Sequence, residues 1–365
     1  MSKRQIQVRT SNFSYRVVIE EGSLSVLGKA MRLLFPSEQA LLVSDNRVFS
    51  LYGDRTIYSL EEEGWKVKTA LISPGERSKT LRGASRLYDR ALDSGLDRNS
   101  PIIALGGGVV GDLAGFVAST YLRGVPLVMV PTSLLAQVDS SVGGKVAVNH
   151  PRGKNLIGSI YPPRLVLIDP RLLDSLPGRQ IKAGLAEVVK YGIIYDSAFF
   201  NYCEEELENL LRRKSSSLAE AVARSVQIKA NVVEEDEFEK DYRRILNFGH
   251  TIGHALEAAT AYKYYLHGEA VLIGMAAATG IAASMEKIDT HLAERIINLL
   301  QKIGLKKPPM GLTTEMVIDK LRQDKKRRDG KIVLILPVGI GSVAVSEIDS
   351  EDLIRGEIDK YLRVV

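Results

Sequence analysis

Cysteine is almost missing from this sequence. Among its 365 residues only Cys203 is a cysteine, which excludes an internal disulfide bond and a metal cluster held by several cysteines. A chain of this kind fits a reducing compartment, so we expect a cytoplasmic protein.

Long hydrophobic runs are missing as well. The longest uncharged apolar stretch covers residues 270–285, fewer than the roughly 20 that a helix needs to span a bilayer. Its glycine and alanine content favours close helix packing, so we interpret it as a buried helix. The first residues run into an alternating pattern without an apolar segment, so we expect neither a signal peptide nor a membrane partner.

Neither sign of charge dominates. Lys and Arg total 49 and Asp and Glu total 44, which leaves a net charge of +5. That excess is too small to indicate a nucleic-acid-binding protein, and we expect no nucleic-acid partner. With 45% hydrophobic and 25% charged residues the composition excludes a disordered chain, and the length predicts two domains.

The first half of the chain alternates short apolar runs with helical stretches. The apolar runs cover residues 40–45, 67–72, 101–105, 127–130 and 165–169. Strands of continuous apolar character separated by helices indicate a parallel sheet covered on both faces. Such sheets bind ligands beyond the carboxyl ends of their strands, where this chain has Asp45, Gly75-Glu76, 106–108 and Thr132-Ser133.

The second half is mostly helical. Helices are predicted over 180–191, 196–213, 218–233, 250–261, 269–285 and 291–303, and one β-rich piece over 332–336. The turn Leu176-Pro177-Gly178 marks the joint. We therefore predict an α/β N-terminal domain over 1–176 with a parallel, Rossmann-like sheet, and a mostly α-helical C-terminal domain over 177–365. We expect the active site in the cleft between the domains.

A glycine-rich turn follows the third predicted strand. Residues 106–111 read GGGVVG and satisfy G-x-G-x-x-G, a pattern that lets a pyrophosphate approach the backbone at a helix N-terminus. The acidic residue expected about 20 positions later is missing, so this is not an ordinary dinucleotide-binding fingerprint. A tight strand-to-helix turn without a ligand is the alternative interpretation.

A second polar stretch extends over residues 139–155. Gly143-Gly144-Lys145 suggests a phosphate loop, but Val146 stands where that loop needs Ser or Thr, so we reject it. The stretch still contains two lysines, an aspartate and an asparagine between apolar runs. We therefore expect it to bind an anionic ligand at least as readily as to form a structural loop.

Three of the five histidines fall between positions 250 and 267. His250 and His254 are four residues apart on a predicted helix, so they share one face and can both reach a metal. His267 follows just before the next helix. The metalloprotease pattern H-E-x-x-H is absent, so a carboxylate ligand must come from elsewhere, and Glu187 is a candidate. Surface and helix-end histidines without a ligand are the alternative.

The segment 320–331 contains four cations in a row, at 325–328. A solvated run of charge is the ordinary interpretation of such a segment, with a phosphate contact or a nucleic-acid patch as alternatives. It contains no aromatic side chain that could stack on a base, which argues against the nucleic-acid patch.

Five stretches of the sequence are far more specific together than any one motif is alone. They are GGGVVGD at 106–112, PTSLLAQVDSSVGGK at 131–145, GKN at 153–155, AEVVKYG at 186–192 and LNFGHTIGHA at 246–255. Together they resemble the 3-dehydroquinate synthase family of sugar phosphate cyclases, over nearly the whole chain. The resemblance implies conversion of 3-deoxy-D-arabino-heptulosonate 7-phosphate to 3-dehydroquinate and phosphate, the second step of the shikimate pathway. It also implies catalytic NAD, a divalent metal (zinc or cobalt) and a homodimer.

The resemblance also assigns residues. It implies Glu187, His250 and His267 as metal ligands, which moves His254 to the substrate side. It implies catalytic roles for Glu239 and His254 as proton acceptors, and for Lys145, Arg243 and Asn247. The implied substrate contacts are Arg123, Asp139, Lys145, Asn155, Lys190, Lys229, Arg243, Asn247, His254, Lys325 and Lys326. The cations among them suit a substrate that carries both a carboxylate and a phosphate.

The implied nucleotide contacts lie in the first half. They are Asp45, Asn46, Glu76, Lys79, Gly107, Gly108, Val109, Asp112, Thr132, Ser133, Lys154, Leu172 and Ser175. Asp45 ends the first predicted strand and can supply the ribose-binding carboxylate that the glycine turn lacks. The chain departs from the family pattern at Asp241, a usual Gly, at Ser133, and at Leu172 and Ser175, where Phe and Thr are frequent.

The implied reaction moves one hydride to NAD and returns it, with phosphate elimination between the two steps and an intramolecular aldol closure at the end. Another sugar phosphate cyclase with a different substrate is the nearest alternative. A metal-dependent NAD polyol dehydrogenase is the second, although a neutral polyol needs no pocket so rich in lysine. A basic nucleic-acid-binding module leaves the histidines and the glycine turn unexplained.

Overall fold

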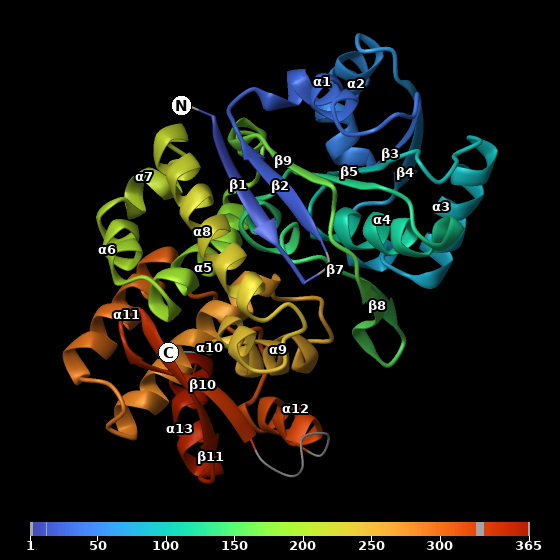
Figure 1. Cartoon of the computed structure of the whole chain (residues 1–365). Coiled ribbons are helices and arrows are strands. Elements are labelled where there is room, and N and C mark those ends of the chain that lie inside the picture. Colours follow the sequence, from blue (N-terminus) through green and yellow to red (C-terminus); the bar gives the residue numbers. More distant parts are fainter. Residues whose placement is uncertain (1–2, 12, 326–331, 364–365) are drawn as a thin grey trace. The chain divides into compact units, whose positions relative to one another are not determined.

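The computed structural model describes residues 3–11, 13–325 and 332–363 of the chain, and Figure 1 shows its helices and strands. These residues divide into two compact units. The first unit contains residues 1–176 and 215–238, and the second contains 177–214 and 239–365. Residues 215–238, which the sequence analysis places in the second domain, therefore pack in the first unit.

The first unit is built on a seven-stranded sheet. Its strands are β1 (Arg4–Arg9), β2 (Ser14–Ile19), β3 (Gln39–Asp45), β4 (Lys66–Ile72), β5 (Ile102–Gly106), β6 (Leu127–Pro131) and β9 (Leu165–Ile168). They lie in the order β1-β2-β9-β6-β5-β3-β4, and every pair except β1 with β2 is parallel. The five strands predicted from apolar runs are confirmed, as is the α/β fold class.

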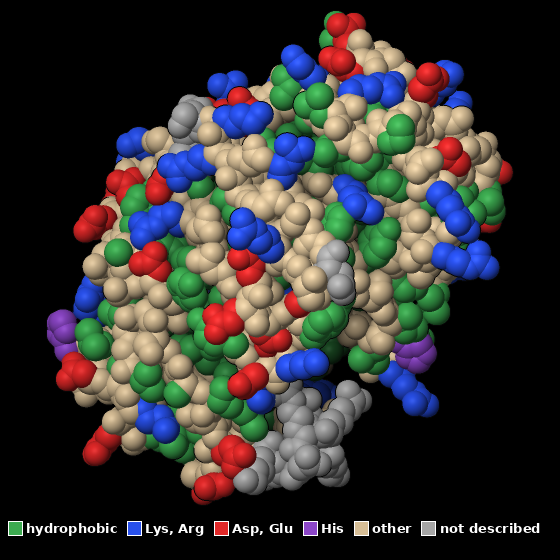
Figure 2. Space-filling view, in the orientation of Figure 1, with side chains coloured by type: hydrophobic (Ala, Val, Ile, Leu, Met, Phe, Trp, Pro, Cys, Tyr) green, Lys and Arg blue, Asp and Glu red, His purple; other side chains and the backbone are tan. Residues whose placement is uncertain are grey.

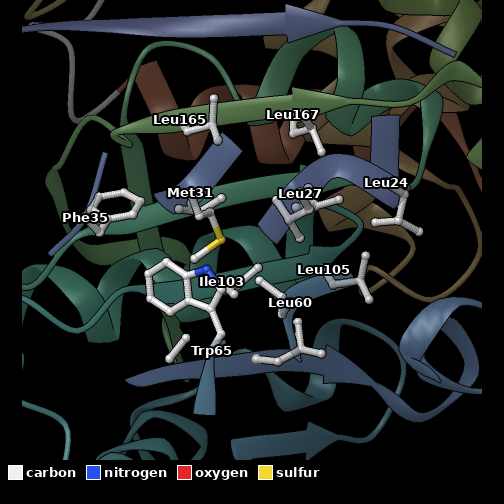
Figure 3. Packing of buried hydrophobic residues seen from close by; sticks show 14 of the residues in the cluster. Leu24, Leu27, Met31, Phe35, Leu60, Trp65, Ile103, Leu105, Leu165 and Leu167 are labelled. Atoms are coloured by element: carbon white, nitrogen blue, oxygen red, sulfur yellow. The ribbon is translucent and has the colours of Figure 1, made fainter. Parts of the chain in front are cut away.

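Helices complete the first unit. They are α1 (Leu27–Arg32), α2 (Asn46–Glu61), α3 (Leu81–Asp93), α4 (Gly108–Thr120) and α8 (Ser215–Glu235), with a two-stranded sheet formed by β7 (Lys145–His150) and β8 (Gly153–Ile160). Figure 3 shows the core on one face of the large sheet, where Trp65 and Met31 pack against Leu60, Ile103 and Leu165. This continuous apolar packing holds the strand ends in fixed positions.

The register of the sheet brings three predicted ligand-binding segments to one edge. Ser44 of β3 pairs with Leu105 of β5, and Gly106 of β5 pairs with Pro131 of β6. The residues that follow these strands therefore leave the sheet side by side, as expected for the binding edge of a parallel sheet.

The second unit is mostly helical, as predicted. Its elements are α5 (Gly178–Ile194), α6 (Ser197–Glu205), α7 (Leu207–Leu211), α9 (His250–Ala259), α10 (His267–Ser284), α11 (Thr290–Ile303), α12 (Thr314–Lys325), β10 (Ile332–Gly339), β11 (Ser342–Ile348) and α13 (Glu351–Leu362). The single helix expected over 196–213 is two, because α6 ends before Glu206 and α7 begins after it.

Helix α10 is the buried helix expected from the long apolar run, since all of its residues from Gly268 to Ala282 are buried. Its glycines allow close packing: a Cβ atom built on Gly274 would lie 2.0 Å from the backbone oxygen of Gly249, the residue before α9. Helices α9 and α10 therefore approach each other at backbone distance. Among the described residues, every helix is too short or too polar to cross a membrane.

Candidate active site

Three helices of the second unit each contribute one member of a possible metal site. Glu187 lies in the middle of α5, His250 is the first residue of α9 and His267 is the first residue of α10. The Nε2 atoms of both histidines lie 3.7 Å from Oε1 of Glu187. One ligand atom from each residue falls within 4.8 Å of the others, so the three can share one cation.

The chemistry of this group fits a divalent metal. Both carboxylate oxygens of Glu187 are buried and accept no hydrogen bond of normal geometry from the described residues, although the ammonium of Lys190 contacts Oε2. Burial lowers the pKa of His250 well below its usual value, and the charge of Lys190 lowers it further, so the imidazole is neutral. Neutral imidazoles and a carboxylate are the mixed ligand set of catalytic zinc sites.

The remaining ring nitrogens of the two histidines contact acceptors on the protein. Nδ1 of His250 lies 3.1 Å from the backbone oxygen of Phe248, and Nδ1 of His267 lies 3.0 Å from Oε2 of Glu257. The sequence analysis missed Glu257. Its position three residues after His254 placed a carboxylate near the histidines, but nothing in the sequence indicated a contact with the next helix.

His254 is exposed and belongs to a second group. One atom each of His254, Glu257 and His267 lie within 4.8 Å of one another. The spacing argument paired His254 with His250, and their rings do meet edge to face at a centroid distance of 5.4 Å. The structure nevertheless places His250, and not His254, with Glu187.

Other predicted residues of the second unit lie on the segment before α9. Nδ2 of Asn247 donates to Oε1 of Glu239 over 2.6 Å, and Glu239 adopts the left-handed backbone conformation with φ of 56°. Arg243 is buried and Asp241 is exposed. Lys325 ends α12, and Lys326, with the rest of the predicted basic run, lies outside the described residues.

The glycine turn of the first unit has the geometry of a phosphate cradle. Gly107 precedes the first residue of α4, Gly108, so the free amides of that helix end face outward from the turn. A Cβ atom on Gly107 would lie 3.4 Å from Oγ of Ser133, and one on Gly108 would lie 3.2 Å from Oγ of Ser140. A small pocket lined by Gly106, Gly107 and Ser140, among others, adjoins the turn. The turn therefore fits a pyrophosphate.

Several predicted nucleotide and substrate residues form one polar cluster. Lys79 is buried, and its ammonium contacts the carboxylate of Asp112 and donates to the side-chain oxygen of Asn155. Glu76 lies 4.0 Å from the same ammonium. Burial raises the pKa of Asp112 even though Lys79 opposes that change. The cluster brings together Lys79, Asp112 of α4 and Asn155 of β8. Lys154 is the residue before Asn155.

A second ion pair joins two predicted substrate residues. Nζ of Lys229, on α8, donates to both the backbone oxygen and Oδ1 of Asp139 over 2.6 Å. Lys145 is exposed at the start of β7. Arg123 is exposed in the turn after α4 with φ of 68°, and no hydrogen bond or ion pair among the described residues joins it to the other predicted residues.

The remaining nucleotide residues lie near β3. Oδ1 of Asp45 accepts hydrogen bonds from the amides of Arg47 and Val48, and so caps α2, which Asn46 begins. Tyr52 donates to the backbone oxygen of Leu172 and contacts Oγ of Ser175. Leu172 is buried in the core. Val109 and Thr132 flank the glycine turn and the end of β6, so they share the binding edge with Asp45.

The exposed charges do not form one large basic surface on the face shown in Figure 2, where Lys and Arg side chains are interspersed with Asp and Glu.

Comparison with known proteins identifies the family of the chain. Residues 69–183 match the family model for the N-terminal part of 3-dehydroquinate synthase, and residues 184–327 match the model for its C-terminal part. The 3-dehydroquinate synthase of Pelotomaculum thermopropionicum is 51% identical over 93% of this chain and 92% of its own length. That of Caldanaerobacter subterraneus subsp. tengcongensis is 46% identical over 96% of this chain and 99% of its own length.

Solved structures extend the comparison. A 2-epi-5-epi-valiolone synthase from Streptomyces hygroscopicus subsp. jinggangensis, with NAD+ and Zn2+ bound, is 28% identical, with a TM-score of 0.88 over 97% of this chain and 98% of its own. A 2-deoxy-scyllo-inosose synthase complexed with carbaglucose-6-phosphate, NAD+ and Co2+ is 31% identical, with a TM-score of 0.89 over 98% of this chain and all of its own. An iron-containing alcohol dehydrogenase, 16% identical with a TM-score of 0.69, shares the fold. The chain belongs to the 3-dehydroquinate synthase family.

Proposed function

We propose that this protein catalyses the 3-dehydroquinate synthase reaction, converting 3-deoxy-D-arabino-heptulosonate 7-phosphate to 3-dehydroquinate and phosphate. The observation that carries the proposal is the Glu187–His250–His267 group, in which Glu187 is buried with Lys190 beside it. Relatives at 46–51% identity bear the name of this enzyme, whereas the solved cyclases with other names are 28–31% identical.

NAD and a divalent metal are the cofactors we propose, since structures of two related cyclases contain NAD+ with Zn2+ or Co2+. When bound, the metal polarises substrate oxygens and NAD accepts and returns a hydride. Glu187, His250 and His267 would hold the metal. The turn at Gly107 and Gly108 would bind the pyrophosphate.

The chain's own cations would bind and orient the substrate. Lys145 and Arg123 are exposed cations and Arg243 and Lys190 are buried ones, and positive charges of this kind suit the phosphate and the carboxylate of the substrate. Such groups act mainly by positioning and by stabilising negative charge.

Two residues would move protons. His254 is exposed next to the metal group, so its imidazole can exchange protons with a substrate held there. Glu239 is held by the hydrogen bond from Asn247, which fixes Oε1 and orients the carboxylate. We therefore assign proton transfer to His254 and Glu239, and positioning of Glu239 to Asn247.

A panel of substrates separates this function from the alternatives. The purified protein, with NAD and zinc, is supplied with 3-deoxy-D-arabino-heptulosonate 7-phosphate, with a seven-carbon ketose phosphate that lacks the carboxylate, or with glucose 6-phosphate. Phosphate release from the first compound alone supports the proposal. Faster release from either of the others would identify a different cyclase, and oxidation of glycerol with accumulation of reduced NAD would identify a polyol dehydrogenase.

On the family resemblance we also propose a cytoplasmic homodimer. Sedimentation equilibrium tests the second part, because a mass near 80 kDa is expected for two 40.1 kDa chains, and a mass of one chain would contradict it.

A further inference from the structure

Glu257 is an acidic side chain buried among the histidines of the second unit. It lies in α9, it is 2% exposed, and its Oε2 atom lies 3.0 Å from Nδ1 of His267 on α10. A carboxylate this deeply buried needs a hydrogen-bond donor, and the imidazole supplies one.

The contact fixes which nitrogen of His267 carries the proton. An ionised carboxylate only accepts hydrogen bonds, so Nδ1 of His267 donates. In the neutral imidazole, which is the form that binds a metal, Nε2 then keeps its lone pair. Nε2 is the atom that lies 3.7 Å from Oε1 of Glu187, inside the proposed metal group. The hydrogen bond therefore leaves the lone pair on the atom that would bind the metal.

His250 shows the same arrangement with a different acceptor. Its Nδ1 lies 3.1 Å from the backbone oxygen of Phe248, and its Nε2 lies 3.7 Å from the same Oε1 of Glu187. The side chain of His267 is 31% exposed and that of His250 is 12% exposed, so fewer protein atoms surround the ring of His267. The ring of His267 also contacts the rings of His250 and His254, and the contact with Glu257 is the polar one that fixes its Nδ1.

We propose that Glu257 is a positioning residue of the metal site: it sets the tautomer and the ring orientation of His267, and so increases the affinity for the metal. This inference rests on the metal site of the proposed function. Removal of an acceptor of this kind typically reduces metal affinity 10–100-fold. The competing assignment makes Glu257 itself a ligand, in the group with His254 and His267.

The test measures zinc binding to metal-free protein by calorimetry with a competing chelator. Glu257→Gln keeps the size of the side chain and removes its charge, and Glu257→Asp keeps the charge. Glu357→Gln is the matched control, because Glu357 is a buried carboxylate that contacts Ser284, at the other end of α10. We expect a zinc Kd about 10–100-fold higher for Glu257→Gln, a smaller increase for Glu257→Asp, and an unchanged Kd for Glu357→Gln.

A second readout does not involve the metal. With only five histidines in the chain, the ¹⁵N shifts of His267 in metal-free protein can be assigned with a His267→Gln variant. We expect the Nδ1–H tautomer in the wild type and a mixture in Glu257→Gln, because an amide can also donate to Nδ1. This measurement still tests the proposal if Glu257→Gln folds poorly, since a neutral wild-type His267 protonated on Nε2 and not on Nδ1 would overturn it.

The remaining outcomes distinguish the role of Glu257 from the existence of the metal site. If the wild type binds zinc and folded Glu257→Gln binds it equally well, the role of Glu257 is refuted while the metal site stands. If His254→Ala loses zinc as completely as Glu187→Gln, Glu257 is a ligand of the second group and the positioning role is wrong. A wild type that binds no divalent metal refutes the metal centre of the proposed function itself.

Discussion

Replacing Lys190 with Met should destabilise the metal-free protein and, at the same time, increase its affinity for zinc. Lys190 and Glu187 are one turn apart on α5, their side chains are 2% and 0% exposed, and they form an ion pair. Among the described residues, Lys190 is the one ammonium in contact with this carboxylate. Without it, the negative charge of Glu187 is buried next to the imidazole rings of His250 and His267.

The size of the effect follows from the burial of both charges. Removing one member of a fully buried pair typically costs about 3–5 kcal/mol, because the other charge stays buried without compensation. The lysine and the metal would neutralise the same carboxylate, so the metal-bound variant does not carry this cost. A thermodynamic cycle then requires zinc to bind the variant more tightly by the same energy, and about 3 kcal/mol corresponds to roughly 100-fold in Kd.

Two measurements on the same samples test the cycle. Denaturant unfolding of chelator-treated protein gives the free energy of unfolding, and competition with a chromophoric chelator gives the zinc Kd. Lys182→Met is the matched control, since Lys182 lies on the same helix and is exposed. Its unfolding free energy should change by no more than about 0.5 kcal/mol. Activity of Lys190→Met should fall, because the proposed substrate contact is lost as well.

Either of two results would refute the reasoning. Metal-free Lys190→Met as stable as the wild type would mean that the ion pair does not neutralise Glu187 in solution. A destabilised variant with unchanged zinc affinity would mean that Glu187 is not a ligand of the metal.

Three further predictions follow from the packing and the polar contacts. Gly107→Ala should raise the KM for NAD while the Tm stays unchanged, because the added methyl group has room beside the turn but occupies the approach to it; an unchanged KM would remove the turn from the nucleotide site. Lys229→Met should cost about 2–3 kcal/mol of unfolding free energy, since the two charge-assisted hydrogen bonds to Asp139 are lost; a loss below 0.5 kcal/mol in urea unfolding, roughly a surface-substitution effect, would contradict this. Gly274→Ala should reduce stability by about 3 kcal/mol or more, because a Cβ atom there would lie 2.0 Å from a backbone atom. Gly356→Ala on α13, where no atom lies within 4 Å of the added Cβ, should instead add about 0.5–1 kcal/mol. Similar shifts in Tm for the two variants would show that α9 and α10 do not pack this closely.

The sequence predicts the central strands well because their physical signal is local. Strands β3, β5, β6 and β9 are buried on both faces, so each is a continuous apolar run. The β7–β8 sheet gives no such signal, since β8 is exposed or half-buried along its whole length. Helix α8 was recognised as a helix, but its place in the first unit depends on contacts such as that of Lys229 with Asp139, 90 residues away.

In the candidate site, too, local sequence spacing was informative and contacts between different helices were not predictable. The pair His250 and His254 was visible because four residues span one helical turn, but the choice between them depends on where α5 places Glu187. The resemblance supplied that choice, and the structure brings the three residues together. Glu257 had no comparable signal, because its partner His267 lies on a different helix.

The most direct test of the proposed function follows phosphate and reduced nicotinamide in the same cuvette. The protein is given 3-deoxy-D-arabino-heptulosonate 7-phosphate with NAD and zinc, and 3-dehydroquinate is quantified at the end. We predict one phosphate for each dehydroquinate, no net accumulation of reduced NAD, and loss of both products when a chelator removes the metal. Accumulation of reduced NAD in proportion to the substrate consumed, or phosphate release that survives the chelator, would contradict the account.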